Sequence, residues 1–235
     1  MNLLAYSGFI NAIFIFSMGF FVYLKNKKYQ ENQIFFLLCL SIVFWQLNYG
    51  FWQLADNEIE SLFFLKLLMI GALLSSTFLL HLVLSFLNLI KKNKNVLILI
   101  YVISFSFLGF VFSPFFISEI KNYSFYPYWP IAGVGININF IWESILAVIS
   151  FWLLIKNYFQ LTGEKKNQIG YFILALGIAI IGGIFNVPQW YGIELYPYGN
   201  FLIFLYPLII AFAILRYHLF GIKIILTELL VGVMG

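Results

Sequence analysis

The chain has 235 residues, of which 63% are hydrophobic and only 9% are charged. Soluble domains carry about 25% charged residues, so this composition excludes a water-soluble domain and indicates an integral membrane protein. The net charge of +4 is not gathered on one face of a soluble domain, so it does not indicate nucleic-acid binding. The single cysteine, Cys39, excludes an intrachain disulfide and a cysteine metal site.

Seven apolar stretches approach the roughly 20 residues that a helix needs to cross a bilayer. They cover residues 3–24, 34–54, 62–90, 96–117, 138–159, 169–189 and 200–215. The last is short, and we expect its helix to begin earlier. The N-terminus has neither a basic region nor a small-residue cleavage site, so the first stretch is expected to be a retained span. The sequence therefore predicts an all-α membrane protein: one bundle of seven transmembrane helices.

The basic residues predict the orientation of this bundle. Of the 13 Lys and Arg residues, all except Lys66 and Lys121 follow the first, third, fifth or seventh stretch. Cytoplasmic loops are enriched in Lys and Arg, so we expect the N-terminus outside and the C-terminus in the cytoplasm. The acidic residues expected on the outer side are Asp56, Glu58, Glu60, Glu119 and Glu194.

The two longer outer loops, residues 123–130 and 190–199, are rich in Tyr and Trp. Such residues often form an aromatic belt at the depth of the lipid headgroups. They are also suited to form a lid over an outward-facing pocket. Both interpretations stay open at this point.

Ionisable residues inside a span are costly and are candidates for function. Lys66 and Glu143 lie at similar depth from the outer side, so they either form an ion pair between two helices or separately reach the interface. His81 lies deeper, and no second span histidine accompanies it to complete a metal site. We expect His81 to be hydrogen-bonded inside the bundle, and we expect no metal and no cofactor.

The outer half of the spans collects amides, an acid and indoles, whereas the inner half is mostly Leu, Ile and Phe. A few polar groups on apolar walls are typical of a small-molecule site, although hydrogen bonds between helices would use the same residues. The candidate ligand-binding residues are Asn48, Trp52, Lys66, Trp142, Glu143, Asn186 and Trp190.

Small residues and prolines mark the last two spans. Gly177, Gly182 and Gly183 are expected to allow close helix approach. Pro188 and Pro207 are expected to kink the sixth and seventh helices.

The last seventy or so residues carry a set of motifs that resembles the N-terminal seven-helix region of bacterial membrane histidine kinases. In that family the seventh helix ends in an Ile/Leu-Arg-Tyr-x-Leu-Phe-x-Ile pattern and leads into the signalling part. The matching segments here are Gly170-Tyr171-Phe172, Gly182-Gly183, Asn186, Tyr196-Pro197-Tyr198-Gly199-Asn200, Tyr206-Pro207 and Ile214-Leu215-Arg216-Tyr217-His218-Leu219-Phe220-Gly221-Ile222.

The resemblance implies a sensor module whose helix packing responds to an outer or intramembrane stimulus, a small molecule or a lipid. Its partners would be the lipid bilayer, a downstream kinase domain and, as a homodimer, a second copy. Residues 1–222 would form the sensor domain. Residues 223–235 would begin a further apolar helix or a connector, so that the chain looks truncated and kinase activity is not assigned to it. The output residues implied are Arg216, Tyr217, His218, Leu219 and Phe220.

A small seven-helix transporter is the alternative, and it predicts a pocket reachable from both sides. Pro188-Gln189 matches half of the Pro-Gln signature of one such family, but a second Pro-Gln pair is missing. A retinal protein needs a lysine in the middle of the last span, which this sequence lacks. No soluble-enzyme motif is present, and a membrane enzyme would need His81 and Glu143 to meet although their depths differ.

Overall fold

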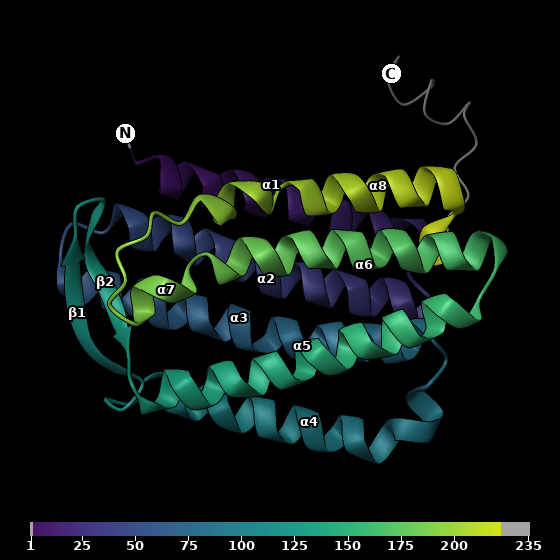
Figure 1. The fold of residues 1–235 in the computed structure, drawn as a ribbon, viewed down its shortest axis with the longest axis horizontal. Coiled ribbons are helices and arrows are strands. Elements are labelled where there is room, and N and C mark those ends of the chain that lie inside the picture. The colour runs from purple at the N-terminus through teal and green to yellow at the C-terminus, as the bar shows by residue number, and fades with distance from the viewer. Residues whose placement is uncertain (1, 222–235) are drawn as a thin grey trace.

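The computed structural model describes residues 2–221 and consists of a helical bundle with one β-hairpin at its end (Figure 1). Six helices are long and apolar enough to cross a membrane. This confirms the first six predicted spans as helices, with shifted boundaries. They are α1 (Leu3–Lys25), α2 (Gln30–Leu54), α3 (Glu58–Phe86), α4 (Ile90–Val111), α5 (Val134–Gln160) and α6 (Gly163–Ile184).

The seventh stretch forms two pieces, the 3-10 turn η1 (Tyr198–Leu202) and the helix α8 (Leu205–Tyr217). The 13 residues of α8 cover only about 20 Å at 1.5 Å per residue, less than the roughly 30 Å of a bilayer core. Because η1 precedes it, the whole stretch begins before residue 200, as predicted. Pro207 lies in the first turn of α8, where its missing N–H has no helical partner to lose, so it begins the helix and does not kink it.

The sixth stretch is also divided, but not by a kink at Pro188 as predicted. Helix α6 ends at Ile184, and a short helix, α7 (Val187–Trp190), follows after Phe185 and Asn186. Pro188 lies at the start of α7. Proline has no N–H to donate to the carbonyl of Ile184, four residues earlier, so α6 cannot continue regularly through Pro188.

Local capping residues account for several helix ends. The side chain of Asn57 accepts a hydrogen bond from the backbone N–H of Glu60 at 2.9 Å and begins α3. Asn88 follows the C-terminal end of α3 and has a φ of 57°. This is the left-handed backbone conformation that often terminates a helix and that asparagine tolerates. Helix α4 then starts at Ile90, so the three lysines at 91, 92 and 94, predicted in a loop, lie in its first turns.

The largest departure from the all-α prediction is an antiparallel β-hairpin formed by β1 (Ile117–Tyr123) and β2 (Tyr126–Ala132). It occupies the aromatic loop between the fourth and fifth spans and includes Ile117, which was predicted to end the fourth span. Trp129 is 0% exposed. The hairpin is therefore a packed part of the protein, not a loose aromatic belt.

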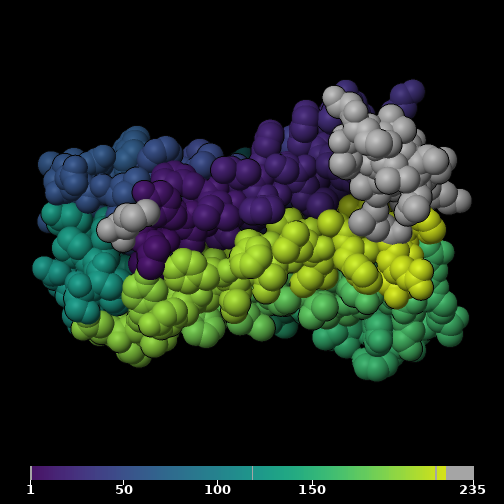
Figure 2. Space-filling model, turned by 90° about the horizontal axis from the view of Figure 1, so that it is seen from above, coloured from purple at the N-terminus to yellow at the C-terminus, as the bar shows by residue number. Residues whose placement is uncertain are grey.

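The hairpin and the exit of α8 lie at opposite ends of the bundle (Figure 1). Seen from above, η1 and α8 run beside α1 along its length (Figure 2). Helix α4 lies at the edge of the bundle, and α5 and α6, joined at the exit end, separate toward the hairpin (Figure 1). This divergence positions the cavity described below.

Small residues bring several backbones together. A Cβ added to Gly71 of α3 would lie 2.6 Å from the backbone oxygen of Ser41 in α2, closer than atoms normally approach. One added to Gly182 would lie 2.8 Å from the backbone oxygen of Gly199, which confirms the predicted close approach there. Gly177 has nothing within 4 Å of such an atom, so it is not a packing contact within the described chain.

Candidate functional site

A cavity of about 330 Å³ lies in the half of the bundle nearer the hairpin. Its walls come mainly from α2, α3, α5 and α6, with contributions from α1, α7 and α8. Most lining side chains are aliphatic. The aromatic members are Trp45, Tyr49, Trp52, Phe140, Trp190 and Tyr206, and the smaller polar or acidic members are Ser75, Ser76, Glu143, Ser144 and Asn186.

Four of the seven predicted ligand-binding residues line this cavity: Trp52, Glu143, Asn186 and Trp190. The carboxylate of Glu143 accepts a hydrogen bond from the side-chain amide of Asn139 at 2.8 Å. Asn186 is 5% exposed, and its side-chain oxygen has no hydrogen-bond partner. The structure thus brings together residues from α2, α5 and the α6–α7 junction, while their role in binding stays a prediction.

The other three predicted residues do not line the cavity. Asn48 donates a hydrogen bond to the backbone oxygen of Phe44, one turn earlier in α2, at 2.7 Å. The indole N–H of Trp142 donates to the hydroxyl of Ser104 in α4 at 3.0 Å. Lys66 is half-buried on α3.

Of the two alternatives for Lys66 and Glu143, the structure does not show the ion pair between the two helices. Among the described residues, the carboxylate of Glu143 is hydrogen-bonded to the side-chain amide of Asn139. Residue counting gave similar depths, but depth does not specify which face of a helix a side chain occupies.

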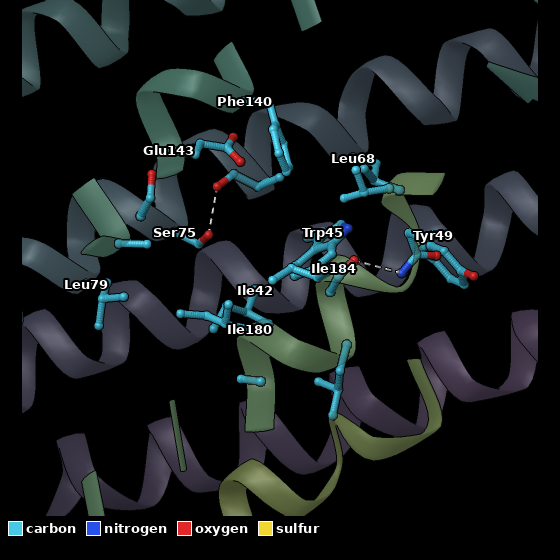
Figure 3. A pocket seen from close by; sticks show the side chains of 18 of the residues that line it. Ile42, Trp45, Tyr49, Leu68, Ser75, Leu79, Phe140, Glu143, Ile180 and Ile184 are labelled. Carbon is cyan, nitrogen blue, oxygen red and sulfur yellow. Dashed lines mark hydrogen bonds between the residues drawn. The ribbon is translucent and has the colours of Figure 1, made fainter. Parts of the chain in front are cut away.

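Sequence reasoning missed several lining residues, above all Trp45, Tyr49 and Phe140. Trp45 and Tyr49 precede Trp52 by seven and three residues, and Phe140 precedes Glu143 by three. Residues at these spacings share one face of a helix. A search along the faces that carry Trp52 and Glu143 would have found them. Figure 3 shows Glu143 and Phe140 together on one side of the cavity, with Trp45 near Ile184 across it.

The hairpin closes the end of the bundle next to the cavity. The ring of Trp129 packs edge-on to that of Trp52, with centroids 4.7 Å apart. The indole N–H of Trp52 donates to the backbone oxygen of Tyr128 at 3.3 Å, and the hydroxyl of Tyr126 donates to the backbone oxygen of Trp52. Burial raises the pKa of Tyr126 to about 12, so this hydroxyl keeps its proton at neutral pH. Of the two interpretations of the aromatic loop, the contacts fit a lid.

The second outer loop is fastened to the hairpin. The hydroxyl of Tyr123 donates to the backbone oxygen of Gln189 at 2.7 Å, and the ammonium of Lys121 donates to that of Gly192 at 3.1 Å. The carboxylate of Glu194 accepts from the backbone N–H of Ser124 at 2.7 Å. Hydrogen bonds from the Ser124 side chain and backbone, with Lys121 nearby, lower the pKa of Glu194.

At the other end, the chain does not simply leave the bundle after α8. His218 and Phe220 both have positive φ, 51° and 60°, which is costly for residues with a Cβ. This path turns Leu219 and Phe220 into the bundle, where both are buried. The ring of Phe220 contacts those of Phe35 in α2, Phe86 in α3 and Phe172 in α6, with centroids 4.7, 6.2 and 6.0 Å away.

Residues at the beginning of α6 contact this exit segment, residues 217–220. The imidazole Nδ1 of His218 lies 2.7 Å from the carboxylate of Glu164, and the side-chain amide of Gln168 donates to the backbone oxygen of Tyr217 at 2.7 Å. The ring of Tyr171 stacks on that of Tyr217 at 5.2 Å. We call Glu164, Gln168 and Tyr171 the exit clamp. No sequence motif indicated its two polar members.

Two of the predicted output residues are therefore core residues, Leu219 and Phe220, and two are held by the exit clamp, Tyr217 and His218. Arg216 is exposed. Their role in output stays a prediction. The predicted connector at residues 223–235 lies outside the residues that the structure describes.

His81 is hydrogen-bonded within the bundle, as predicted. Its Nδ1 lies 2.8 Å from the hydroxyl of Tyr101 in α4. The hydroxyls of Thr77 and Ser104 form a second link between α3 and α4 at 2.7 Å. These bonds attach the peripheral helix α4, and they account for His81 without a catalytic role.

The comparison with protein families agrees with the motifs at the exit. Residues 8–223 match the family described as the N-terminal 7TM region of histidine kinase. No curated protein and no solved structure matches the chain. Since the match extends over nearly the whole chain, and since six helices have the length and composition of membrane spans, this multi-pass membrane protein belongs to the family of N-terminal seven-transmembrane regions of histidine kinases.

Proposed function

We propose that the chain is the input module of a two-component histidine kinase, which detects an outer or intramembrane stimulus and passes it to a cytoplasmic effector. The observation that carries this proposal is that α6 contacts both ends of the route. Ile180 and Gly183 near its C-terminal end line the cavity. Glu164 and Gln168 near its N-terminal end hold the exit segment.

A small displacement of α6 at the cavity would therefore reach Tyr217 and His218 through hydrogen bonds and packed rings. Packed interfaces tend to switch between discrete arrangements, so such displacements can be transmitted over the length of a helix. The positive φ angles at His218 and Phe220 persist because surrounding contacts hold them. Loss of those contacts would let the exit segment change its path.

The orientation is part of the proposal, with the hairpin outside and the exit in the cytoplasm. The structure supports it because Asp56, Glu58 and Glu194 belong to the hairpin end, whereas Lys165 and Arg216 belong to the exit end. Cysteine labelling tests it. In a Cys39→Ser background, a cysteine introduced at Glu194 should react with an impermeant maleimide on intact cells, and one at Lys92 only after permeabilisation. The reverse result would contradict the orientation.

The transporter alternative predicts access from both ends. In the structure, the exit end is filled by the buried rings of Phe35, Phe172 and Phe220. This favours a sensor, since these rings block passage from the cavity toward that end within residues 2–221.

Signalling is tested by joining the chain, at its C-terminus, to a histidine-kinase core and measuring autophosphorylation in membranes. Gln168→Ala removes the hydrogen bond to Tyr217 and should change the basal phosphorylation several-fold. The matched control is Asn157→Ala, which removes a similar amide-to-carbonyl bond, 2.8 Å long, within α5 and should leave phosphorylation unchanged. Equal phosphorylation in both variants would contradict a route through α6.

A further inference from the structure

The cavity opens sideways, toward the lipid, between α5 and α6. Ser144 and Val148 on α5 and Ile184 on α6 line the cavity and are also exposed on the flank of the bundle, Val148 at 67% and Ile184 at 52%. The two helices diverge along this flank toward the hairpin (Figure 1). A molecule dissolved in the bilayer could reach the cavity here without crossing water.

The other routes are closed within residues 2–221. Trp52 and Tyr49 are 2% and 1% exposed beneath the hairpin, where Trp129 and Tyr126 cover Trp52. Toward the exit, Leu176 and the ring of Tyr206 belong to a continuous buried cluster. Entry from the membrane is therefore the route that the packing leaves.

The described lining of the cavity carries one carboxylate and no basic side chain. Glu143 is the only ionisable carboxylate among the described lining residues, and no Lys, Arg or His is among them. The oxygen of Asn186 has no partner. The hydroxyls of Ser75 and Ser76 donate to backbone oxygens one turn earlier in α3, at 2.7 and 3.1 Å, so they face the cavity as acceptors.

Aromatic rings surround this carboxylate. Trp45, Tyr49, Trp52, Phe140 and Trp190 all line it, and Figure 3 shows Phe140 beside Glu143 and Trp45 across from them. Tryptophan and tyrosine faces attract ammonium groups, and a carboxylate adds a direct charge. A half-buried acid among aromatic rings, with no Lys, Arg or His among the described lining residues, fits a positively charged ligand.

We propose that the cavity binds an amphipathic ammonium compound that enters from the bilayer between α5 and α6. Its ammonium group lies against Glu143 and the aromatic rings, and its apolar part lies along Ile180, Ile184 and Val148 or extends into the lipid. A volume of about 330 Å³ is near the lower limit of ligand pockets, so it accommodates a small head group and a short apolar segment. This assignment rests on the proposed sensor function, since it names the stimulus class for the same module.

Binding is tested with the full chain in lipid nanodiscs, by quenching of tryptophan fluorescence. The probe is a brominated alkyl-trimethylammonium, compared with a brominated alkanol and a brominated fatty acid of the same chain length. Three of the six tryptophans of the chain line the cavity, Trp45, Trp52 and Trp190. The ammonium should quench saturably and bind at least tenfold more tightly than the other two. Equal quenching by all three probes would overturn the ligand class.

Two pairs of variants test separately the charge of Glu143 and the entry route between α5 and α6. Glu143→Gln should weaken ammonium binding at least tenfold, whereas Glu119→Gln on the hairpin should leave it unchanged. Val148→Phe, which narrows the opening, should slow association at least several-fold, whereas Ile145→Phe, on an exposed position outside the cavity, should not. Unchanged binding in Glu143→Gln, or unchanged association in Val148→Phe, would overturn the respective part of the proposal.

A failure of the ligand assignment can be distinguished from a failure of the proposed sensor function. Ammonium binding without any change in phosphorylation of the kinase fusion would contradict the sensor function and leave the site standing. Stimulus-dependent phosphorylation without ammonium binding would contradict the ligand class and leave the sensor function standing. Because glutamine has nearly the shape of glutamate, thermal unfolding of Glu143→Gln checks that the fold is retained, and the probe comparison on the unaltered chain does not depend on this variant.

Discussion

The helices α2 and α3 differ sharply from α4, α5 and α6 in how they are packed. In their apolar stretches, 56% and 61% of the residues of α2 and α3 are buried, against 22% for α4, 22% for α5 and 28% for α6. The first pair contact each other through glycine and carry the hairpin on their ends. The second group has most of its surface free for lipid and leaves a cavity between α5 and α6. The comparison indicates a rigid part, α1–α3 with the hairpin, and a loosely packed part in which movement costs little.

The strongest test of the rigid part is to remove the tryptophan under the hairpin. Trp129→Ala should lower the free energy of unfolding by about 3–5 kcal/mol, because a fully buried aromatic ring leaves a cavity. Denaturation in mild detergent measures this, and Phe115→Ala, at a position 73% exposed, serves as the matched control. Similar losses in both variants would mean that the hairpin is not part of the rigid core.

A methyl group added to a glycine of α3 and one added to a glycine of α6 should have opposite effects on the stability of the protein. Gly71→Ala places a Cβ 2.6 Å from the backbone of α2 and should cost about 1–3 kcal/mol by overpacking. Gly177→Ala in α6 meets nothing within 4 Å and should be neutral or slightly stabilising, because alanine favours helix. Thermal unfolding of the two variants and of the unaltered chain measures this difference in stability. Destabilisation of both would show that α6 packs as closely as α3.

The exit clamp should matter more for output than for stability. Glu164 and His218 are both exposed to a large extent, so Glu164→Gln should change the free energy of unfolding by less than about 1 kcal/mol. Any effect should shrink at high salt, because exposed charges are screened. Unfolding at low and high salt, together with phosphorylation of the kinase fusion, measures both. A large loss of stability would place this contact in the rigid part.

The smallest expected effect is a pH dependence of hydrogen exchange in the second outer loop, at residues 191–197. The pKa of Glu194 is lowered in the folded state. The ionised carboxylate therefore stabilises the folded loop above the ordinary glutamate pKa of about 4.3, and this stabilisation is lost as the pH falls through the lowered pKa. Hydrogen exchange of residues 191–197 in the unaltered chain should therefore rise as the pH falls through the lowered pKa of Glu194. In Glu194→Gln this acid-dependent step should disappear. A step that persists in the variant would assign it to another group.

Much of the site could be predicted from the sequence because polar groups are conspicuous in apolar spans. Trp52, Glu143, Asn186 and Trp190 line one cavity, and each was recognised as a polar or indole side chain near an outer end. The sequence could not decide whether Lys66 pairs with Glu143, because residue counts give the depth of a side chain along a helix but not the direction it faces. For the same reason the sequence could not show that Trp142 and Asn48 lie outside the cavity lining, where Trp142 bonds to Ser104 of α4 and Asn48 to Phe44 of its own helix.

The hairpin could not be predicted with the same rules. Pro127 and Pro130 lie within β2, and proline in a run normally argues against a strand. A two-stranded hairpin has only edge strands, so each proline can lie where no ladder hydrogen bond is required. The aromatic residues were noticed, but their burial depends on α2 and α7, which are distant in sequence.

The sequence by itself determined the membrane class, the first six spans and the family, because length, apolarity and a local motif are properties of consecutive residues. Only the tertiary structure decided that the aromatic loop packs over the end of the bundle, that α5 and α6 diverge beside a cavity, and that the start of α6 holds the residues that follow α8. Each of these depends on which faces of distant helices meet. In an apolar bundle nearly every face is hydrophobic, so a hydrophobic pattern alone does not specify those partners.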